Sequence, residues 1–327
     1  MAPGPDEAAP PFHMSTEPVS PQQVAGGLRS AVNTTMRGKT AVVDLAITAL
    51  LAGGHLLVQD LPGTGKTLLA KSMAKAIGGR FGRIQCTPDL LPSDVTGTSV
   101  YRPESGDWDF RAGPIFSNVV LIDEINRASP RTQSAMLQPM EERQVSVDSQ
   151  TWAMLDPFFC IATQNPFGQV GTFPLPESQL DRFAMVISVG LPDRTAEREI
   201  ITGAGGVDVL DSVTAVADTE MIRAAIAATA RTHADDKIVE YVLDLVAATR
   251  AETHLSQGAS PRASVSLMHL ARAHAVVDER DYVTPDDVQA VLVPALSHRV
   301  MVAGRVDTSA ASEVLTWLMT QVSVPTA

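Results

Sequence analysis

The fold of this chain is decided by the stretch LLVQDLPGTGKT, which spans residues 56–67. Its apolar start predicts a buried parallel strand. Residues 66–77 then place apolar side chains on one face of a helix. Between the two, Gly63 and Gly65 can adopt the φ values of a tight turn and let the backbone approach an anion closely. The stretch therefore predicts a strand, a glycine turn and a helix in direct succession.

This succession predicts a phosphate-binding loop, because backbone N–H groups and a helix N-terminus attract phosphate. Lys66 is expected to reach the β- and γ-phosphates, and the Thr67 hydroxyl to bind Mg²⁺. The usual pattern G-x-x-x-x-G-K-[ST] begins with a glycine, whereas this chain has Asp60 at that position. A glycine turn before an ordinary helix is the alternative, and a second motif is needed to decide.

The second motif is NVVLIDE, residues 118–124. Its apolar residues predict a buried strand that delivers two carboxylates at its C-terminal end, where parallel α/β sheets bind their ligands. Asp123 is placed to hold Mg²⁺, directly or through water. Glu124 is placed to polarise the attacking water as a general base. A phosphate loop followed by this pair indicates a nucleotide hydrolase.

Two further polar residues fit the same site. Asn165 follows a predicted strand at residues 158–162, and its amide is suited to orient the attacking water and to sense the γ-phosphate. An Asn before proline is also a common turn residue. Arg262 stands near the start of a predicted helix, where a cation is unfavourable for the helix dipole. Arg262 is therefore expected to face an anion, the alternative being a solvated surface arginine.

The composition indicates an acidic globular protein. The chain has 327 residues, 45% of them hydrophobic, and a net charge of -12. This length predicts two domains, and the negative charge argues against general binding to nucleic acid. Cys86 and Cys160 lack the spacing of a metal site or a disulfide framework, which fits two core residues in a reducing compartment.

No signal peptide is evident at the N-terminus. The longest apolar run, residues 41–52, is too short to span a membrane and contains Asp44. We therefore expect a cytoplasmic protein without a membrane span.

Changes of pattern divide the chain into three parts. Residues 1–22 are rich in Pro, Ala and acidic residues and predict a disordered tail. Residues 23–192 alternate strands and helices, with irregular segments at 87–116 and 144–153 that contain predicted hairpins. Residues 193–327 predict helices only, ending in a C-terminal helix. The fold class is therefore α/β.

Taken together, these features resemble the AAA+ ATPases, and specifically the MoxR family, over roughly residues 35–299. The resemblance implies a P-loop αβα domain with a parallel sheet, followed by a small all-helical lid domain. The stretches that carry it are ALLAGGH (49–55), TPDLLPSD (87–94), DEINRA (123–128), MEERQV (140–145), ATQNP (162–166), LPESQLDRF (175–183) and SPRA (260–263).

The resemblance also implies roles for the nucleotide-site residues. Lys66 and Thr67 match Walker A, Asp123 and Glu124 match Walker B, and Asn165 matches sensor 1. The implied cofactors are ATP and Mg²⁺, with Thr67 and Asp123 at the metal. The residues expected to contact the nucleotide are Pro62, Gly63, Thr64, Gly65, Lys66, Thr67 and Leu68, with the adenine near Arg37 and Gly38.

Three arginines receive roles from the same resemblance. Arg262 matches sensor 2, and its action within its own subunit or across an interface is left open. Arg182 matches the arginine finger that reaches a neighbour's nucleotide in a ring, with Arg127 as the alternative. Lys39 stands where the family usually has Gln, which affects the adenine pocket, whereas Asp60 is tolerated within the family.

The function implied by the resemblance is a Mg²⁺-dependent ATPase that forms a ring, expected to be a hexamer. It would act as a chaperone that matures or assembles client complexes, together with a von Willebrand factor A-domain partner. The segments 87–116 and 144–153 would face a substrate or partner, although their aromatic residues also suit simple packing of the hairpins. A nucleic-acid-remodelling motor and a nucleotide-switched scaffold with little turnover are the alternatives.

Overall fold

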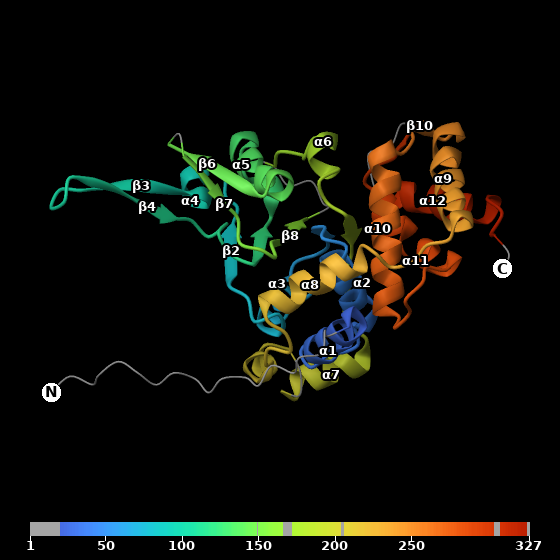
Figure 1. Cartoon of the computed structure of the whole chain (residues 1–327), viewed down its shortest axis with the longest axis horizontal. Coiled ribbons are helices and arrows are strands. Elements are labelled where there is room, and N and C mark those ends of the chain that lie inside the picture. The colour runs from blue at the N-terminus through green and yellow to red at the C-terminus, as the bar shows by residue number, and fades with distance from the viewer. Residues whose placement is uncertain (1–19, 149, 166–171, 204–205, 304–307, 326–327) are drawn as a thin grey trace.

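The computed structural model describes residues 20–148, 150–165, 172–203, 206–303 and 308–325. Most of the predicted tail, residues 1–19, and the Pro166 of the ATQNP stretch lie outside these ranges. A parallel five-stranded sheet with the strand order β2-β5-β8-β1-β9 forms the centre (Figure 1). Its strands are β1 (Leu56–Gln59), β2 (Phe81–Gln85), β5 (Val119–Asp123), β8 (Phe159–Gln164) and β9 (Met185–Ile187).

The sheet is buried on both faces, which explains the uninterrupted apolar runs of its strands. On β5, Val119 and Leu121 pack into a cluster with the N-terminal helices, while Val120 and Ile122 pack against the helix that follows the strand. The parallel strands and the strand–helix alternation confirm the predicted α/β class. The helices of this layer are α1 (Pro21–Asn33), α2 (Thr40–Leu51), α3 (Lys66–Ala76) and α5 (Pro130–Glu142).

The C-terminal part is mainly helical, as predicted, with one addition. A short antiparallel ladder joins β10 (Leu255–Gln257) to β11 (Met301–Val302) in a region where only helices were expected. Two- and three-residue strands leave almost no periodic signal, so the sequence pattern did not reveal them. The helical elements are α7 (Arg194–Ile201), the 3₁₀ segment η2 (Gly206–Ser212), α8 (Thr219–Thr229), α9 (Asp236–Ala251), α10 (Pro261–Val277), α11 (Pro285–Leu296) and α12 (Thr308–Gln321).

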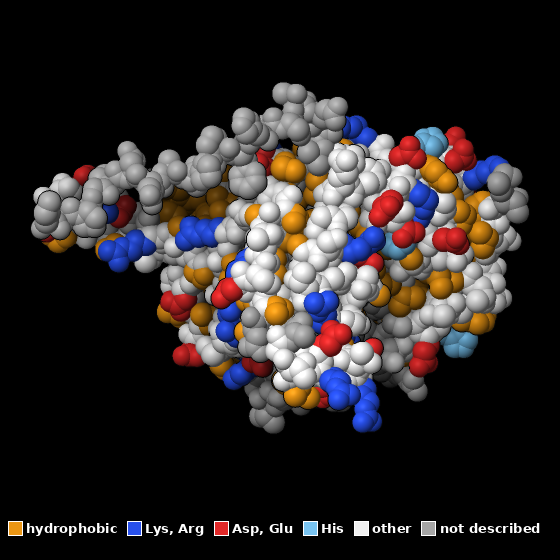
Figure 2. Space-filling view, turned by 90° about the horizontal axis from the view of Figure 1, so that it is seen from below, with side chains coloured by type: hydrophobic (Ala, Val, Ile, Leu, Met, Phe, Trp, Pro, Cys, Tyr) orange, Lys and Arg blue, Asp and Glu red, His pale blue; other side chains and the backbone are white. Residues whose placement is uncertain are grey.

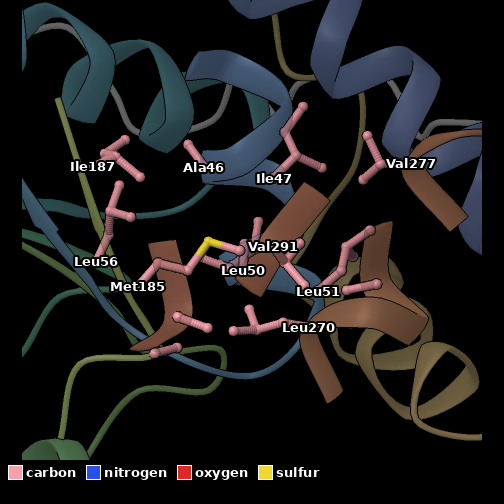
Figure 3. Packing of buried hydrophobic residues seen from close by; sticks show 14 of the residues in the cluster. Ala46, Ile47, Leu50, Leu51, Leu56, Met185, Ile187, Leu270, Val277 and Val291 are labelled. Carbon is pink, nitrogen blue, oxygen red and sulfur yellow. The ribbon is translucent and has the colours of Figure 1, made fainter. Parts of the chain in front are cut away.

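Helix α2 connects the sheet to the C-terminal helices. Figure 3 shows its residues Ile47 and Leu50 in one group of side chains with Leu56 and Met185 of the sheet and Val291 of α11. All of these side chains belong to one buried apolar cluster. Full burial of such a side chain contributes about 1.5–3 kcal/mol. The helices α10 and α11 are therefore packed firmly on the sheet domain.

Two hairpins extend from the other end of the molecule. The hairpin β3–β4 (Gly97–Arg102 and Asp107–Ala112) reaches away from the body as a long arm (Figure 1). The ring of Phe110 stacks on Trp152 of the second hairpin with centroids 4.4 Å apart. Trp108 at the arm is 70% exposed. Phe110 and Trp152 therefore pack the two hairpins together, whereas Trp108 is exposed. The second hairpin is β6–β7 (Gln144–Val147 and Gln150–Ala153), and the short elements are α4 (Pro92–Thr96), η1 (Ile125–Arg127) and α6 (Glu177–Leu180).

Candidate nucleotide site

The loop between β1 and α3 has the backbone of a phosphate-binding turn. Gly63 and Gly65 have φ values of 84° and 96°, in the left-handed region that favours glycine. The space beside Gly63 is open, since a Cβ built there meets no atom within 4 Å. Lys66 begins α3 and turns its Nζ back onto the Leu61 carbonyl at 2.6 Å. The loop can therefore offer backbone N–H groups and one ammonium to an anion.

Asp60 is the residue that departs from the usual loop pattern. Its side chain is buried, and its carboxylate accepts hydrogen bonds from the N–H of Leu61 at 2.8 Å and of Gly190 at 2.7 Å. Burial alone would raise the pKa of Asp60. The hydrogen bonds from Gly190, Leu61 and Thr64, with the nearby charge of Lys66, bring that pKa below its ordinary value. Asp60 is therefore an ionised part of the loop at neutral pH.

The carboxylates of β5 lie on the same edge of the sheet as this loop. β1, β8 and β5 are neighbours in register, so their C-terminal ends meet. Asp123 is buried and accepts hydrogen bonds from Thr163 at 3.4 Å and from Arg83 of β2 at 2.9 Å. Asn165 directly follows β8 on this edge. We call this end of the sheet, with residues 59–67, 123–124 and 164–165, the carboxyl edge.

Glu124 has an unusual backbone for its residue type. Its φ of 56° lies in the left-handed region, where a residue with a Cβ is uncommon, and its N–H donates to the Thr163 hydroxyl at 2.9 Å. Such strain is concentrated at functional sites. Its side chain accepts a hydrogen bond from Arg127 at 2.8 Å. Arg127 therefore contacts the predicted general base of its own subunit.

The predicted adenine-side segment lies next to the phosphate loop. A Cβ on Gly65 would meet the Met36 side chain at 3.8 Å. Gly38 approaches Ala196 of α7 so closely that a Cβ would lie 2.9 Å from it. Lys39 Nζ donates to the Leu191 carbonyl at 2.6 Å. The element beside this segment is therefore α7, whereas α10 and α11 pack on α2.

Arg182 and Arg262 come together at the opposite edge of the sheet. Both arginines ion-pair with Glu141 at the end of α5, at 3.4 Å and 3.1 Å. Arg182 precedes β9, and β9 starts beside the start of β1. β1 has four residues, and at about 3.3 Å per residue it separates these arginines from the phosphate loop by roughly 13 Å or more. We call this end, with residues 53–55 and 181–184, the amino edge.

A third arginine, Arg299, binds residues of the amino edge. It is only 5% exposed, and it bonds the Asp181 carboxylate at 2.8 Å and the Phe183 carbonyl at 2.9 Å. Arg262 also lies 3.7 Å from Asp181. A cavity of about 220 Å³ opens here, and it is lined by Arg182, Arg262 and Arg299 together with Gly53–His55. Arg299 is held as a structural support, whereas Arg262 is about half exposed.

Comparison with known proteins agrees with this architecture. Residues 55–185 match the family model described as "ATPase family associated with various cellular activities (AAA)", and residues 247–316 match the model of the AAA lid domain. The chain is 40% identical to Chaperone MoxR1 of Mycobacterium tuberculosis, covering 86% of this chain and 79% of that protein. It is 31% identical to Protein MoxR of Paracoccus denitrificans, covering 84% and 87%.

The chain belongs to the MoxR family of AAA+ ATPases. Another relative, YeaC of Bacillus subtilis, is 43% identical over 90% of this chain and 92% of its own length. A crystal structure of a protein from Cytophaga hutchinsonii superposes with a TM-score of 0.85 at 32% identity, covering 94% of this chain and 96% of that one. These similarities confirm the predicted family and fold.

The MoxR-family fold thus separates the predicted site residues into groups. The carboxyl edge carries Lys66, Thr67, Asp123, Glu124 and Asn165. The left-handed glycines, the helix start and the buried carboxylate suit a nucleotide with Mg²⁺. The amino edge carries Arg182 and Arg262, whereas Arg37 and Gly38 belong to the adenine-side segment beside α7.

Sequence reasoning did not identify the charged partners of these residues. Glu141 and Asp181 lie inside the stretches that carry the family resemblance, but their pairing with Arg262 joins segments far apart in sequence. Arg83 is one of the exposed, alternating residues of β2, and its contact with Asp123 spans 40 residues. An alternating strand pattern identifies such a residue as exposed and does not identify its partner.

Proposed function

We propose that this protein hydrolyses ATP with Mg²⁺ at sites formed between neighbouring subunits of a ring. The observation that carries the proposal is the separation of Arg182 and Arg262 from the phosphate loop, together with their shared partner Glu141. Two arginines held at the same place, about one strand length from Lys66, are suited to a nucleotide bound by the next subunit. A hexamer is the ring size that the family resemblance suggests.

The predicted site residues of the carboxyl edge each have a part in the proposed reaction. The loop N–H groups and Lys66 would bind the β- and γ-phosphates, and Thr67 and Asp123 would hold the metal. Bound Mg²⁺ neutralises charge on the phosphate oxygens. Glu124 takes a proton from the attacking water, and Asn165 orients that water.

The proposal assigns both amino-edge arginines to action in trans. Arg182 stabilises the charge that develops on the phosphoryl group, a role that contributes roughly 10³ to 10⁵ in rate in other NTPases. Arg262, in the role of sensor 2, contacts the same phosphates. Arg127 remains the alternative finger, but its ion pair with Glu124 favours a role inside its own subunit.

The test is Mg²⁺-dependent ATP hydrolysis measured against protein concentration. Specific activity should rise with concentration, because a site completed by a neighbour requires assembly. Glu124→Gln is the matched control, since it removes the base and keeps the size and hydrogen bonding of the side chain. Activity that persists in Glu124→Gln would reject Glu124 as the base. A concentration-independent rate at the dilution where light scattering gives the mass of a monomer would reject the shared site.

We further propose a chaperone role for client protein complexes, with a von Willebrand factor A-domain partner. The support is the name of the relative Chaperone MoxR1 and the pair of hairpins distant from the lid. A cavity of about 520 Å³ lies between the hairpins and offers exposed aromatic surface to a protein partner. It is lined by Thr98, Ser99, Trp108, Phe110, Asp148, Gln150 and Trp152. Loss of partner capture in Trp108→Ala with unchanged basal ATPase would support this assignment.

Two alternatives have less support. On the described part of the face in Figure 2, Lys and Arg side chains lie among Asp and Glu rather than in one basic surface, which disfavours a nucleic-acid motor. Stimulation of ATP hydrolysis by DNA would instead support the nucleic-acid motor. A nucleotide-switched scaffold needs no general base, so the strained Glu124 argues against it. Among the described helices, none is long and apolar enough to cross a membrane, and we propose a cytoplasmic location.

A further inference from the structure

Three segments that are distant in sequence meet at the phosphate loop. The loop itself, residues 60–67, follows β1. The segment Ser188–Leu191 follows β9, the neighbour of β1 in the sheet. Residues 36–39 follow α1 and lie beside both, through Met36 near Gly65 and Lys39 on Leu191. A nucleotide on this loop would lie along the junction of these segments.

The carboxylate of Asp60 is the group that ties the first two segments together. One oxygen accepts the Leu61 N–H of the loop at 2.8 Å. The other accepts the Gly190 N–H at 2.7 Å and the Ser188 hydroxyl at 3.3 Å. The side chain thus satisfies donors on both segments, and the residue is only 8% exposed. Hydrogen bonds to a charged acceptor are about twice as strong as neutral ones.

A glycine at this position could make none of these bonds. The Gly190 N–H would then lose its carboxylate acceptor. The Leu191 carbonyl that receives Lys39 lies one residue further on. Loss of the Asp60 carboxylate would therefore weaken the contacts between the Ser188–Leu191 segment and the adenine-side residues, as well as the phosphate loop itself.

We propose that Asp60 is a positioning residue for the nucleotide, holding the phosphate loop and the Ser188–Leu191 segment as one preorganised binding unit. The proposal rests on the proposed ATP site and adds a function for the residue that departs from the usual loop pattern. Asp60 touches neither phosphate nor metal in this role. It reduces the conformational freedom that the two segments would otherwise lose on binding.

The test compares Asp60→Asn and Asp60→Gly with the unchanged protein. ADP affinity is measured by calorimetry without Mg²⁺, so that neither metal binding nor turnover contributes. Asp60→Gly, which restores the usual loop residue, should weaken ADP binding by about tenfold, because charged hydrogen bonds across the two segments are lost. Asp60→Asn keeps one acceptor oxygen, so its ADP affinity should lie between those of Asp60→Gly and the unchanged protein. Equal ADP affinity in Asp60→Gly and the unchanged protein would overturn the proposal.

A second buried aspartate supplies the control for a purely structural effect. Asp287 is fully buried in the C-terminal helices and is held by Arg280 and Thr284. Asp287→Asn should lower the melting temperature and leave ADP affinity unchanged. If the two Asn variants lose ADP affinity in proportion to their loss of melting temperature, Asp60 has only a structural role.

The outcomes also separate this proposal from the proposed function. If the unchanged protein binds no ADP, or if Lys66→Ala binds it equally well, the nucleotide site itself is wrong. If Lys66→Ala abolishes binding while Asp60→Gly and Asp60→Asn bind normally, the site is right and the positioning role is wrong. Asp60→Asn keeps the shape of the side chain, so it serves if Asp60→Gly fails to fold.

Discussion

The two edges of the central sheet carry opposite arrangements of charge. At the carboxyl edge, the acidic side chains Asp123 and Glu124 are each paired with an arginine of the same subunit. At the amino edge, the arginines Arg182 and Arg262 share one carboxylate, Glu141. One edge can bind a nucleotide and activate water, and the other can supply cations. Under the proposed function, the comparison teaches that each chain would carry both halves of an ATPase site, at two separate places.

Burial distinguishes the arginines of the amino edge from one another. Arg299 is 5% exposed and has four oxygen partners, so its removal would leave buried groups unsatisfied. Arg262 is 52% exposed, and exposed ion pairs contribute only about 0–1 kcal/mol. Arg262 can therefore exchange Glu141 for a phosphate at little cost. The buried Arg299 bonds the carbonyls of Asp181 and Phe183, the two neighbours of Arg182 in the chain.

The largest effect is expected at the carboxyl edge. Lys66→Ala should weaken nucleotide binding by about a hundredfold or more, because the ammonium is the loop's own cation for the phosphates. Calorimetry with ADP measures the change. Lys71→Ala, at an exposed position on the same helix, is the matched control and should bind normally. Unchanged ADP affinity in Lys66→Ala would show that the carboxyl edge is not the nucleotide-binding edge.

At the amino edge, Arg182→Ala should lower turnover by at least about tenfold while leaving ATP affinity intact. The reason is that Arg182 lies about a strand length from its own phosphate loop and would act on a neighbour's nucleotide. Steady-state hydrolysis and nucleotide titration measure the two quantities separately. Equal turnover in the variant would reject Arg182 as the finger, and a parallel loss of affinity would place it in its own subunit's site.

Mixing variants tests the separation of the edges directly. Lys66→Ala and Arg182→Ala are each expected to be inactive, but a mixed ring contains interfaces with one intact loop and one intact arginine. Mixing them should therefore restore part of the ATPase activity, roughly a quarter of the interfaces if subunits mix at random.

Lys66→Ala mixed with Glu124→Gln is the control for this experiment. Both changes lie on the carboxyl edge, so no interface regains a complete site and activity should stay absent. Arg262→Ala should behave like Arg182→Ala in the mixture, whereas Arg127→Ala should not be rescued, because Arg127 contacts its own subunit's Glu124. Rescue of Arg127→Ala, with no rescue of Arg182→Ala, would make Arg127 the arginine finger and reject Arg182.

A different kind of effect, on folding stability instead of activity, is expected at the amino edge in acid. His298 is buried and its Nε2 donates to the Phe183 carbonyl at 2.9 Å. Burial, with the nearby charge of Arg299, lowers the pKa of His298 from 6.5 to about 3. Between these values the unfolded chain binds a proton that the folded chain does not. Stability therefore falls as pH decreases through this window, by up to about 1.4 kcal/mol per pH unit for this group.

Urea unfolding at pH 6.5 and pH 4.5 measures this contribution. His298→Gln keeps a donor for the Phe183 carbonyl and cannot be protonated, so its stability should depend less steeply on pH than that of the unchanged protein. His55, whose pKa burial also lowers to about 3, still titrates in both proteins and cancels in the comparison. Identical pH dependence would show that His298 is accessible to protons in the folded state.

Local sequence patterns predicted most of the sheet and helices correctly. The loop helix was expected from Lys66 and begins there, and the hairpin predicted within residues 87–116 is formed by β3 and β4. The short ladder of β10 and β11 was missed because its strands are too brief for a periodic signal. The roles of the site residues remain predictions, and the structure adds to them the positions from which each would act.

The sequence by itself determined which residues could do nucleotide chemistry, because a glycine turn, a buried strand and a terminal carboxylate pair each have local patterns. Only the tertiary structure decided their grouping. It brought Asp60 onto Gly190, 130 residues away, and Arg262 onto Glu141, 121 residues away by their numbers. Such contacts depend on strand order and helix packing, which no local periodicity encodes. The separation of the site into two edges is therefore a property of the fold.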